Sequence, residues 1–131
     1  QGRIWRLLVS GLTVADISEF CLSLPGAWPD NPWDHEHPVI KVGAGERGKI
    51  FAFLGHDSVG VKAADSREVA DEWIHRYPGE VTVMAYLGRS GWNTMKFGGG
   101  IPDEEILDAI EESYDRVVHK LPMRVRPVRP D

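Results

Sequence analysis

Three segments of the chain repeat apolar residues at the three- and four-residue spacing of an amphipathic helix. They predict helices over residues 13–24, 66–77 and 102–121. Thr13 followed by Asp16 is a capping arrangement for the first helix, and a proline follows each of the three segments. The apolar stripes are typical of helices that pack against a protein core.

Five segments outside the predicted helices are rich in β-branched and aromatic residues and are bounded by turn residues. We predict strands at 39–43, 49–54, 58–63, 81–87 and 92–97. Short turns favour an antiparallel sheet, and the helices follow no regular βαβ alternation. The sequence therefore predicts an α+β fold with five antiparallel strands and three helices packed mainly on one face. The proline-rich segment 28–33 is expected to be a loop.

Alternation along the predicted strands places cations and aromatic rings together on one face of the sheet. If the aliphatic residues face the helices, the residues between them face the opposite side. This second set contains Lys41, Lys49, Phe51, Phe53, Lys62, Trp92, Thr94 and Lys96. Ammonium groups attract phosphate and aromatic rings stack on bases, and small-molecule sites use the same mixture. A solvated face with a few packed rings is the structural alternative.

Net charge argues at first against a nucleic-acid partner, because phosphate binding needs cations and the chain carries −5 at pH 7. The segment 103–120, however, holds seven acidic and two basic residues, so its local charge of −5 equals that of the whole chain. The segments 41–62, 88–99 and 121–131 each carry a net +2. Segregated charge of this kind can focus an electrostatic field on one part of a surface.

The length of 131 residues and the 42% hydrophobic content are typical of one compact domain. We assign residues 1–131 to a single domain, with its core at 13–122 and a flexible arginine- and proline-rich tail at 123–131. The apolar segment 4–9 is too short to span a membrane and lacks a signal-peptide cleavage site, so a cytoplasmic monomer is expected. The single cysteine, Cys21, excludes an internal disulfide and falls on the apolar stripe of the first helix.

Several short motifs lack the context that their chemistry requires. Residues 43–48 match G-x-G-x-x-G but lead into a strand, which favours a hairpin turn over a phosphate site. The neighbours His56, Asp57 and Ser58 diverge in a turn and do not form a hydrolase triad. One loop carries five candidate metal ligands: Asp30, Asp34, His35, Glu36 and His37. A surface loop is a loose scaffold for a metal, so we predict no metal, no cofactor and no catalytic residue.

The segment 86–94, YLGRSGWNT, resembles the signature of the MmcQ/YjbR family. Further matches follow in family order at 19–27, 51–53, 101–105, 113–114 and 120–122. The resemblance implies a frataxin-like (CyaY-like) fold and DNA binding through a double-wing motif, in which hairpins and sheet surface meet the duplex. Many family members have histidine where this chain has Gly91, so no role of that histidine carries over, and many have lysine near the position of Arg89.

We therefore predict a non-enzymatic protein that binds DNA through a basic and aromatic sheet face and hairpin wings. The phosphate contacts are assigned to Lys41, Lys49, Lys62, Arg89 and Lys96, and the shaped contacts to Trp92 and Asn93. The alternative is a small-molecule-binding or protein-interaction module that uses the same face.

Overall fold

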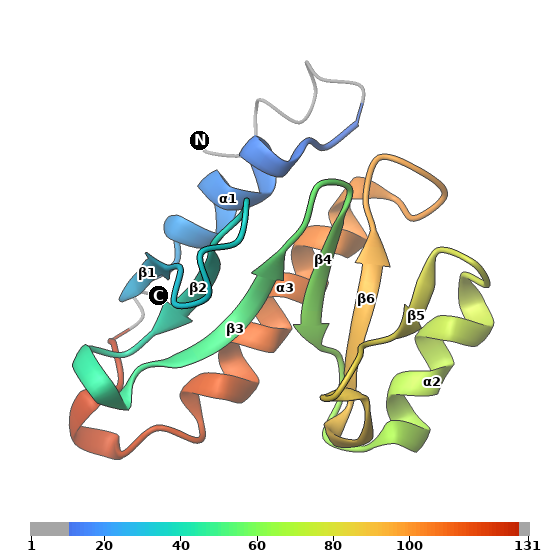
Figure 1. Ribbon diagram of the computed structural model, residues 1–131. Coiled ribbons are helices and arrows are strands. Elements are labelled where there is room, and N and C mark those ends of the chain that lie inside the picture. Colours follow the sequence, from blue (N-terminus) through green and yellow to red (C-terminus); the bar gives the residue numbers. More distant parts are fainter. Residues whose placement is uncertain (1–10, 129–131) are drawn as a thin grey trace.

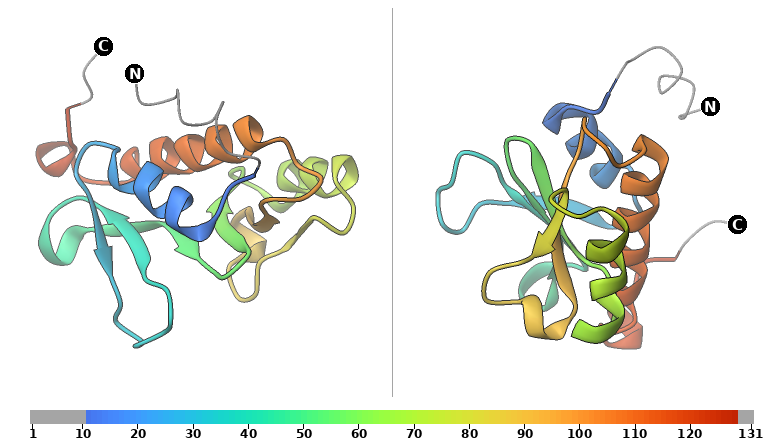
Figure 2. Two further views of the ribbon diagram at one scale, coloured as in Figure 1. Left: turned by 90° about the horizontal axis from the view of Figure 1, so that it is seen from above. Right: turned by 90° about the vertical axis from the view of Figure 1, so that its right-hand side faces the viewer.

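One six-stranded antiparallel sheet, covered by three helices, makes up the fold of the computed structural model, which describes residues 11–128 (Figure 1). The strand order is β1-β2-β3-β4-β6-β5, with bounds β1 Ala27–Asp30, β2 Val39–Val42, β3 Lys49–Leu54, β4 Ser58–Lys62, β5 Val81–Val83 and β6 Trp92–Lys96. The helices are α1 Val14–Leu22, α2 Arg67–Arg76 and α3 Asp103–Val118, and short 3-10 helices are η2 Gly45–Arg47, η3 Gly88–Ser90 and η4 Met123–Val125. All three α-helices lie on one face of the sheet, and the other face, here called the open face, carries none (Figure 2). The predicted α+β class is confirmed, while the segment 4–9 lies outside the described residues.

The helices begin where their capping residues predict. The Thr13 hydroxyl accepts a hydrogen bond from the Asp16 N–H at 3.2 Å, and the Asp16 carboxylate accepts one from the Thr13 N–H at 3.0 Å. Ser66 caps α2 in the same way by accepting from the Val69 N–H at 3.2 Å. The predicted bounds are therefore confirmed to within three residues at each end.

The hydrophobic core lies between the sheet and the helix layer. Tyr114 of α3 is fully buried, its ring packs edge-on against Phe51 at 5.3 Å, and its hydroxyl donates to the Pro25 carbonyl at 2.6 Å. Cys21 is fully buried, and burial raises the pKa of its thiol to about 12, so it acts as a small apolar residue. Within residues 11–128, no helix has the length and apolar character needed to cross a membrane.

The first strand, β1, occupies the segment for which the sequence predicts a loop, so the sheet has six strands instead of five. Pro29 lies inside this strand, and proline is tolerated there because β1 is an edge strand that pairs only with β2. The Trp28 indole fixes the edge by donating to the Gly43 carbonyl at 2.8 Å. Two prolines in the segment hide the strand from a propensity-based prediction.

Phe51 lies on the helix side of the sheet, which corrects the alternation predicted along β3. The register pairs Ile40 with Ala52 but Lys41 with Ile50, so Phe51 is an extra residue in β3. A bulge of this kind breaks the period of two and re-aims one side chain. Phe51 is fully buried as a result, and it belongs to the core instead of the open face.

β3 and β4 diverge toward one end (Figure 1). Ser113 of α3 bridges the two strands there. The ladder between the two strands ends at the pair Ala52 and Val61. Beyond that pair, the Ser113 hydroxyl accepts from the Lys62 N–H at 2.9 Å and donates to the Phe51 carbonyl at 2.7 Å. One buried side chain thus satisfies two backbone groups that the diverging strands leave unpaired.

Part of the segment after α3, for which a flexible tail at 123–131 is expected, packs back onto the body of the protein at Val125 and Arg126. The Arg126 guanidinium donates to the Leu121 carbonyl at 3.0 Å and to the His119 carbonyl at 2.7 Å. Val125 packs against the core. These contacts also supply donors to carbonyl groups at the carboxyl end of α3.

Candidate nucleic-acid interface

A pocket of about 270 Å³, here called the lysine pocket, opens where β3 and β4 diverge. Its lining consists of Lys49, Ile50, Lys62, Ser90, Trp92, Val117 and Lys120. The three lysines come from the start of β3, the end of β4 and the turn after α3. No carboxylate in residues 11–128 forms an ion pair with any of them. The pocket therefore gathers positive charge that the described residues leave without an ion-pair partner.

Lys62 is the central cation of this pocket, and the exposed position predicted for it is wrong. Its side chain is only 7% exposed, and its ammonium group donates to the Ser90 carbonyl at 2.5 Å. Burial lowers the pKa of Lys62, the nearby Asp65 opposes this, and the cations Lys120 and Arg116 lower the pKa further. An anion in the pocket would counter the repulsion among these cations.

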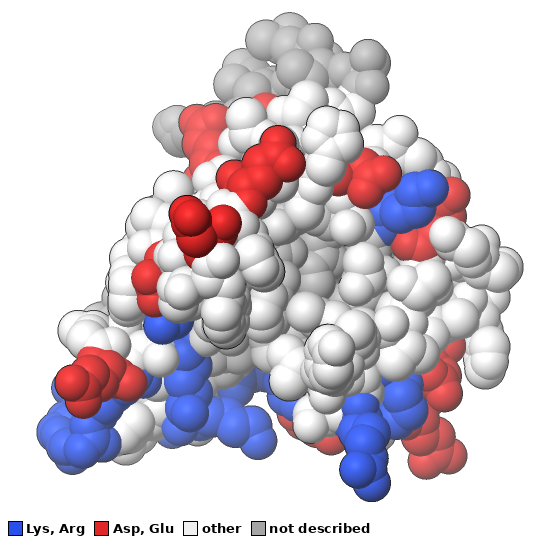
Figure 3. Space-filling model, viewed as in Figure 1, with Lys and Arg blue, Asp and Glu red and all other residues white. Residues whose placement is uncertain are grey.

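Further cations surround the lysine pocket at the same end of the sheet. Arg47 on η2 and Arg89 on η3 are both exposed. We call the set Arg47, Lys49, Lys62, Arg89 and Lys120 the basic end. Lysine and arginine gather along this lower edge of the molecule, with a few acidic residues at its left and right corners, whereas the upper part carries scattered acidic residues and one cation (Figure 3). The segregation of charge predicted from the sequence thus takes the form of an end-to-end asymmetry on this face.

Two of the cations predicted to contact phosphate lie elsewhere. The Lys41 ammonium is 2.8 Å from the Asp30 carboxylate, so an ion pair neutralises it. Lys96 pairs with Ser58 in the β4–β6 ladder, at the opposite end of that ladder from the pair of Lys62 and Trp92. The predicted set therefore divides: Lys49 and Lys62 line the lysine pocket, and Arg89 precedes Ser90, which also lines it.

Asn93 is fully buried, so the surface contact predicted for it is wrong. Its amide donates to the Ala70 carbonyl at 2.9 Å and its side-chain oxygen accepts from the Arg67 guanidinium at 2.5 Å. Because Val61 is its partner in the β4–β6 ladder, Asn93 points toward the helix layer, where it links β6 to α2. Its hydrogen bonds hold β6 and α2 together at this point.

The η3 turn that carries Arg89 is fixed by Arg67 and by glycine geometry. The Arg67 guanidinium donates to the Gly88 carbonyl at 2.9 Å and to the Trp92 carbonyl at 3.1 Å. Gly91 has a φ of +92°, and a Cβ atom there would lie 2.1 Å from the Ala64 carbonyl oxygen. This backbone has no room for a side chain at position 91, so the turn requires glycine there.

Trp92 forms a wall of the lysine pocket but is not an accessible stacking surface. The side chain is 8% exposed. Its ring meets the Phe53 ring edge-on, with centroids 5.5 Å apart and planes at 78°. Trp92 therefore contributes mainly to packing between β6 and β3.

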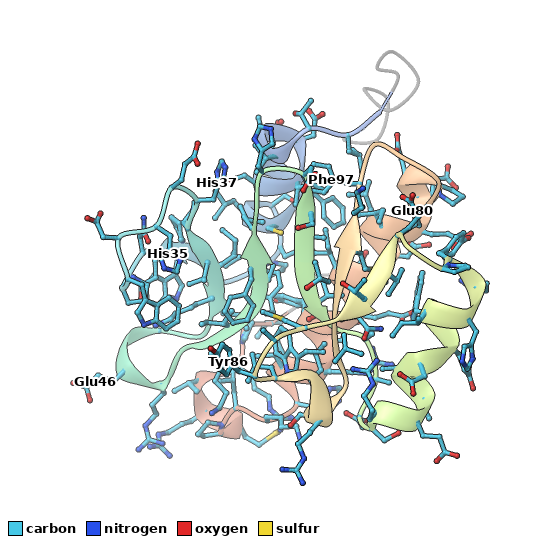
Figure 4. All side chains as sticks on the ribbon, turned by 45° about the vertical axis from the view of Figure 1, so that its right-hand side comes forward. His35, His37, Glu46, Glu80, Tyr86 and Phe97 are labelled. Carbon is cyan, nitrogen blue, oxygen red and sulfur yellow. The ribbon has the colours of Figure 1, made fainter. Side chains whose placement is uncertain are left out.

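A second pocket of about 490 Å³, here called the aromatic pocket, lies at the open face of the sheet. Its lining consists of Trp33, His35, Val39, Phe53, Leu54 and Tyr86. The β1–β2 and β5–β6 connections project from this face (Figure 2), and His35 and Tyr86 belong to these two connections (Figure 4). Trp33 is 55% exposed and Tyr86 is fully exposed. The sequence-based prediction did not include Trp33 or Tyr86 in a site. Both are large aromatic residues outside the predicted apolar stripes of the helices, and this position could have indicated a surface role.

The histidines of the β1–β2 connection contact aromatic rings. His35 packs against Trp33 with ring centroids 6.0 Å apart, and His37 packs against His56 at 6.5 Å. Residues 11–128 contain no group of three or more histidine, cysteine, aspartate or glutamate side chains placed to hold a metal ion. In the described residues, His35 and His37 of this connection therefore make ring contacts.

Comparison with known proteins places the chain among uncharacterised relatives. The YjbR family model matches residues 22–116. The uncharacterized protein YjbR of Escherichia coli K12 is 26% identical over 117 residues, which cover 88% of this chain and 95% of that protein, and YjbR of the O157:H7 strain gives the same figures. The structure is similar to Deinococcus radiodurans protein DR2400, a DUF419 domain, with a TM-score of 0.72 and 26% identity over 82% of this chain and 80% of that one.

Proposed function

The chain belongs to the YjbR family, and from this premise we propose that it binds DNA through phosphate contacts at the basic end. The β1–β2 and β5–β6 connections act as the two wings beside the open face. The protein works in the cytoplasm as a monomer. Analytical ultracentrifugation at the concentrations used for binding measures the oligomeric state. It binds without catalysing a reaction.

The observation that carries this proposal is the convergence of three lysines on one pocket without an ion pair from the described carboxylates. A single exposed lysine is ordinary surface chemistry. Lys62 is only 7% exposed, and burial and the neighbouring cation Lys120 both disfavour its charged form, so an anion beside the two would stabilise that charge. Phosphate oxygens supply the negative charge, and DNA presents phosphates in a regular row.

The composition of the two pockets supports binding over catalysis. Neither of these two linings contains a carboxylate or a cysteine, and His35 is the one histidine among them. A further pocket that shares Lys120 is lined by Asp65, Glu112, Asp115 and His119, and it is not part of the proposed site. Acid–base catalysis ordinarily uses groups such as these held within hydrogen-bonding reach of one another. The proposed site has instead the cations and rings of a recognition surface.

The experiment that tests the proposal is fluorescence anisotropy with duplex DNA over a series of salt concentrations. Affinity should fall by about 0.9 log units per log unit of salt for each phosphate contacted. Lys49→Glu should weaken binding for all sequences alike and lower the salt slope by about 1. Lys96→Glu is the matched control, because it makes the same charge change at another exposed lysine outside the basic end.

The proposal is wrong if Lys49→Glu and Lys96→Glu weaken binding equally, since net charge alone would then account for the loss. It is also wrong if the protein binds neither duplex nor single-stranded DNA even at low salt. In that case saturable, salt-insensitive binding of a metabolite would favour the alternative of a small-molecule-binding module.

A further inference from the structure

Building on the proposed function, we infer that the aromatic pocket receives an unpaired base from a single-stranded segment whose phosphate lies at the basic end. The preferred ligand is then a single strand, or a duplex with an unpaired nucleotide. The base stacks on the rings of the aromatic pocket, while the lysine pocket binds a phosphate of the nucleic-acid backbone.

The lining of the aromatic pocket suits an uncharged, planar ligand. Trp33, Phe53 and Tyr86 contribute rings, and none of the lining residues is a lysine, arginine, aspartate or glutamate. Every base has a π-face, so stacking on such rings tolerates any sequence. The volume of about 490 Å³ falls within the range of small-ligand sites. His35 adds ring nitrogens that can hydrogen-bond to the edge of a base.

The aromatic pocket and the lysine pocket are neighbours, with one pair of contacting rings between them. Phe53 lines the first and Trp92 lines the second, and their ring centroids are 5.5 Å apart. One strand can therefore place a base on one side of this ring pair and a phosphate on the other.

Backbone strain at the rim of the aromatic pocket points the same way. Tyr86 has a φ of +68° and a fully exposed side chain. The left-handed region is unfavourable for a residue with a Cβ atom, most of all for a bulky one such as tyrosine. Strained backbone of this kind is common where a protein grips a ligand. Here it holds the Tyr86 ring in solvent, a position that packing within the protein does not explain.

The test compares three DNA probes of about 12 nucleotides, a length within the site sizes of single-strand-binding folds. They are an oligothymidine strand, an abasic strand with the same backbone, and a duplex. The oligothymidine should bind roughly 5- to 150-fold more tightly than the abasic strand, which is the effect of one stacked base. The duplex should bind no more tightly than the abasic strand, because pairing hides the base faces.

Two substitutions locate the effect. Tyr86→Asn removes the ring while keeping a residue that tolerates the left-handed region, and Tyr86→Phe keeps the ring. Tyr86→Asn should abolish the preference for bases without lowering the melting temperature, whereas Tyr86→Phe should retain it. Because position 86 is fully exposed, folding survives both changes. Trp33→Ala, at another exposed position, should also reduce the preference.

Equal affinity for the oligothymidine and the abasic strand overturns the inference while leaving phosphate binding intact, and the pocket then belongs to a small apolar ligand or another protein. Thymidine monophosphate that binds as tightly as the oligothymidine also overturns it, because the occupant is then a free nucleotide. Failure of every probe to bind at low salt overturns the proposed function itself.

Discussion

Trp92 and Asn93 belong to the signature segment, and their side chains lie inside the protein. There they hold neighbouring strands and helices in position. Asn93 and Arg67 join α2 to β6, and Trp92 closes the space between β6 and Phe53. Residue type alone could not separate these roles from ligand contact, because a tryptophan beside a glycine turn fits both. The register of the β4–β6 ladder settles the direction of each side chain.

The substitution Trp92→Ala should lower the free energy of unfolding by roughly 3 to 5 kcal/mol, because it leaves a cavity against Phe53. Urea denaturation measures this change. Trp33→Ala is a matched control, since that tryptophan is 55% exposed and its loss should cost less than about 0.5 kcal/mol. A small effect for Trp92→Ala together with a loss of single-strand affinity would show that Trp92 is a stacking residue after all.

Helices and most strands could be predicted from the sequence because their periodicity is local. The caps at Thr13 and Ser66 and the stripe of α3 suffice to place the three helices. Two features of the sheet depend on pairing partners and carry no local signal. The edge strand β1 forms only because β2 lies beside it, and the bulge at Phe51 appears only in the register with β2.

The divergence of β3 and β4, which forms the lysine pocket, should depend on Ser113. Ser113→Ala leaves the buried Lys62 N–H and Phe51 carbonyl without their partner, so the free energy of unfolding should fall by about 1 to 3 kcal/mol. Hydrogen exchange at the Lys62 amide should accelerate. Ser23→Ala, which removes an exposed hydroxyl, is the control and should change stability by less than about 0.5 kcal/mol. Equal stability of the two variants would contradict the bridging role.

At the scale of the whole molecule, the asymmetry of charge matters more than the net value of −5. The sequence identified segments of opposite charge, and it supplied three of the five members of the basic end: Lys49, Lys62 and Arg89. It could not show that Lys120 joins them, because that contact depends on where α3 ends over the sheet. Nor could it show that Lys41 is neutralised by Asp30, since the missed strand β1 supplies that carboxylate.

The central claim, that the basic end binds nucleic-acid phosphate, is tested most directly by an amide-resolved NMR titration with DNA at two salt concentrations. The account predicts perturbed amides at residues 47–50, around Lys62, at 88–91 and at Lys120, with smaller shifts at high salt. The amides around Lys96 and the acidic first turn of α3 should stay unchanged. Perturbations centred on α3 or on Lys96, or shifts that do not respond to salt, would contradict it.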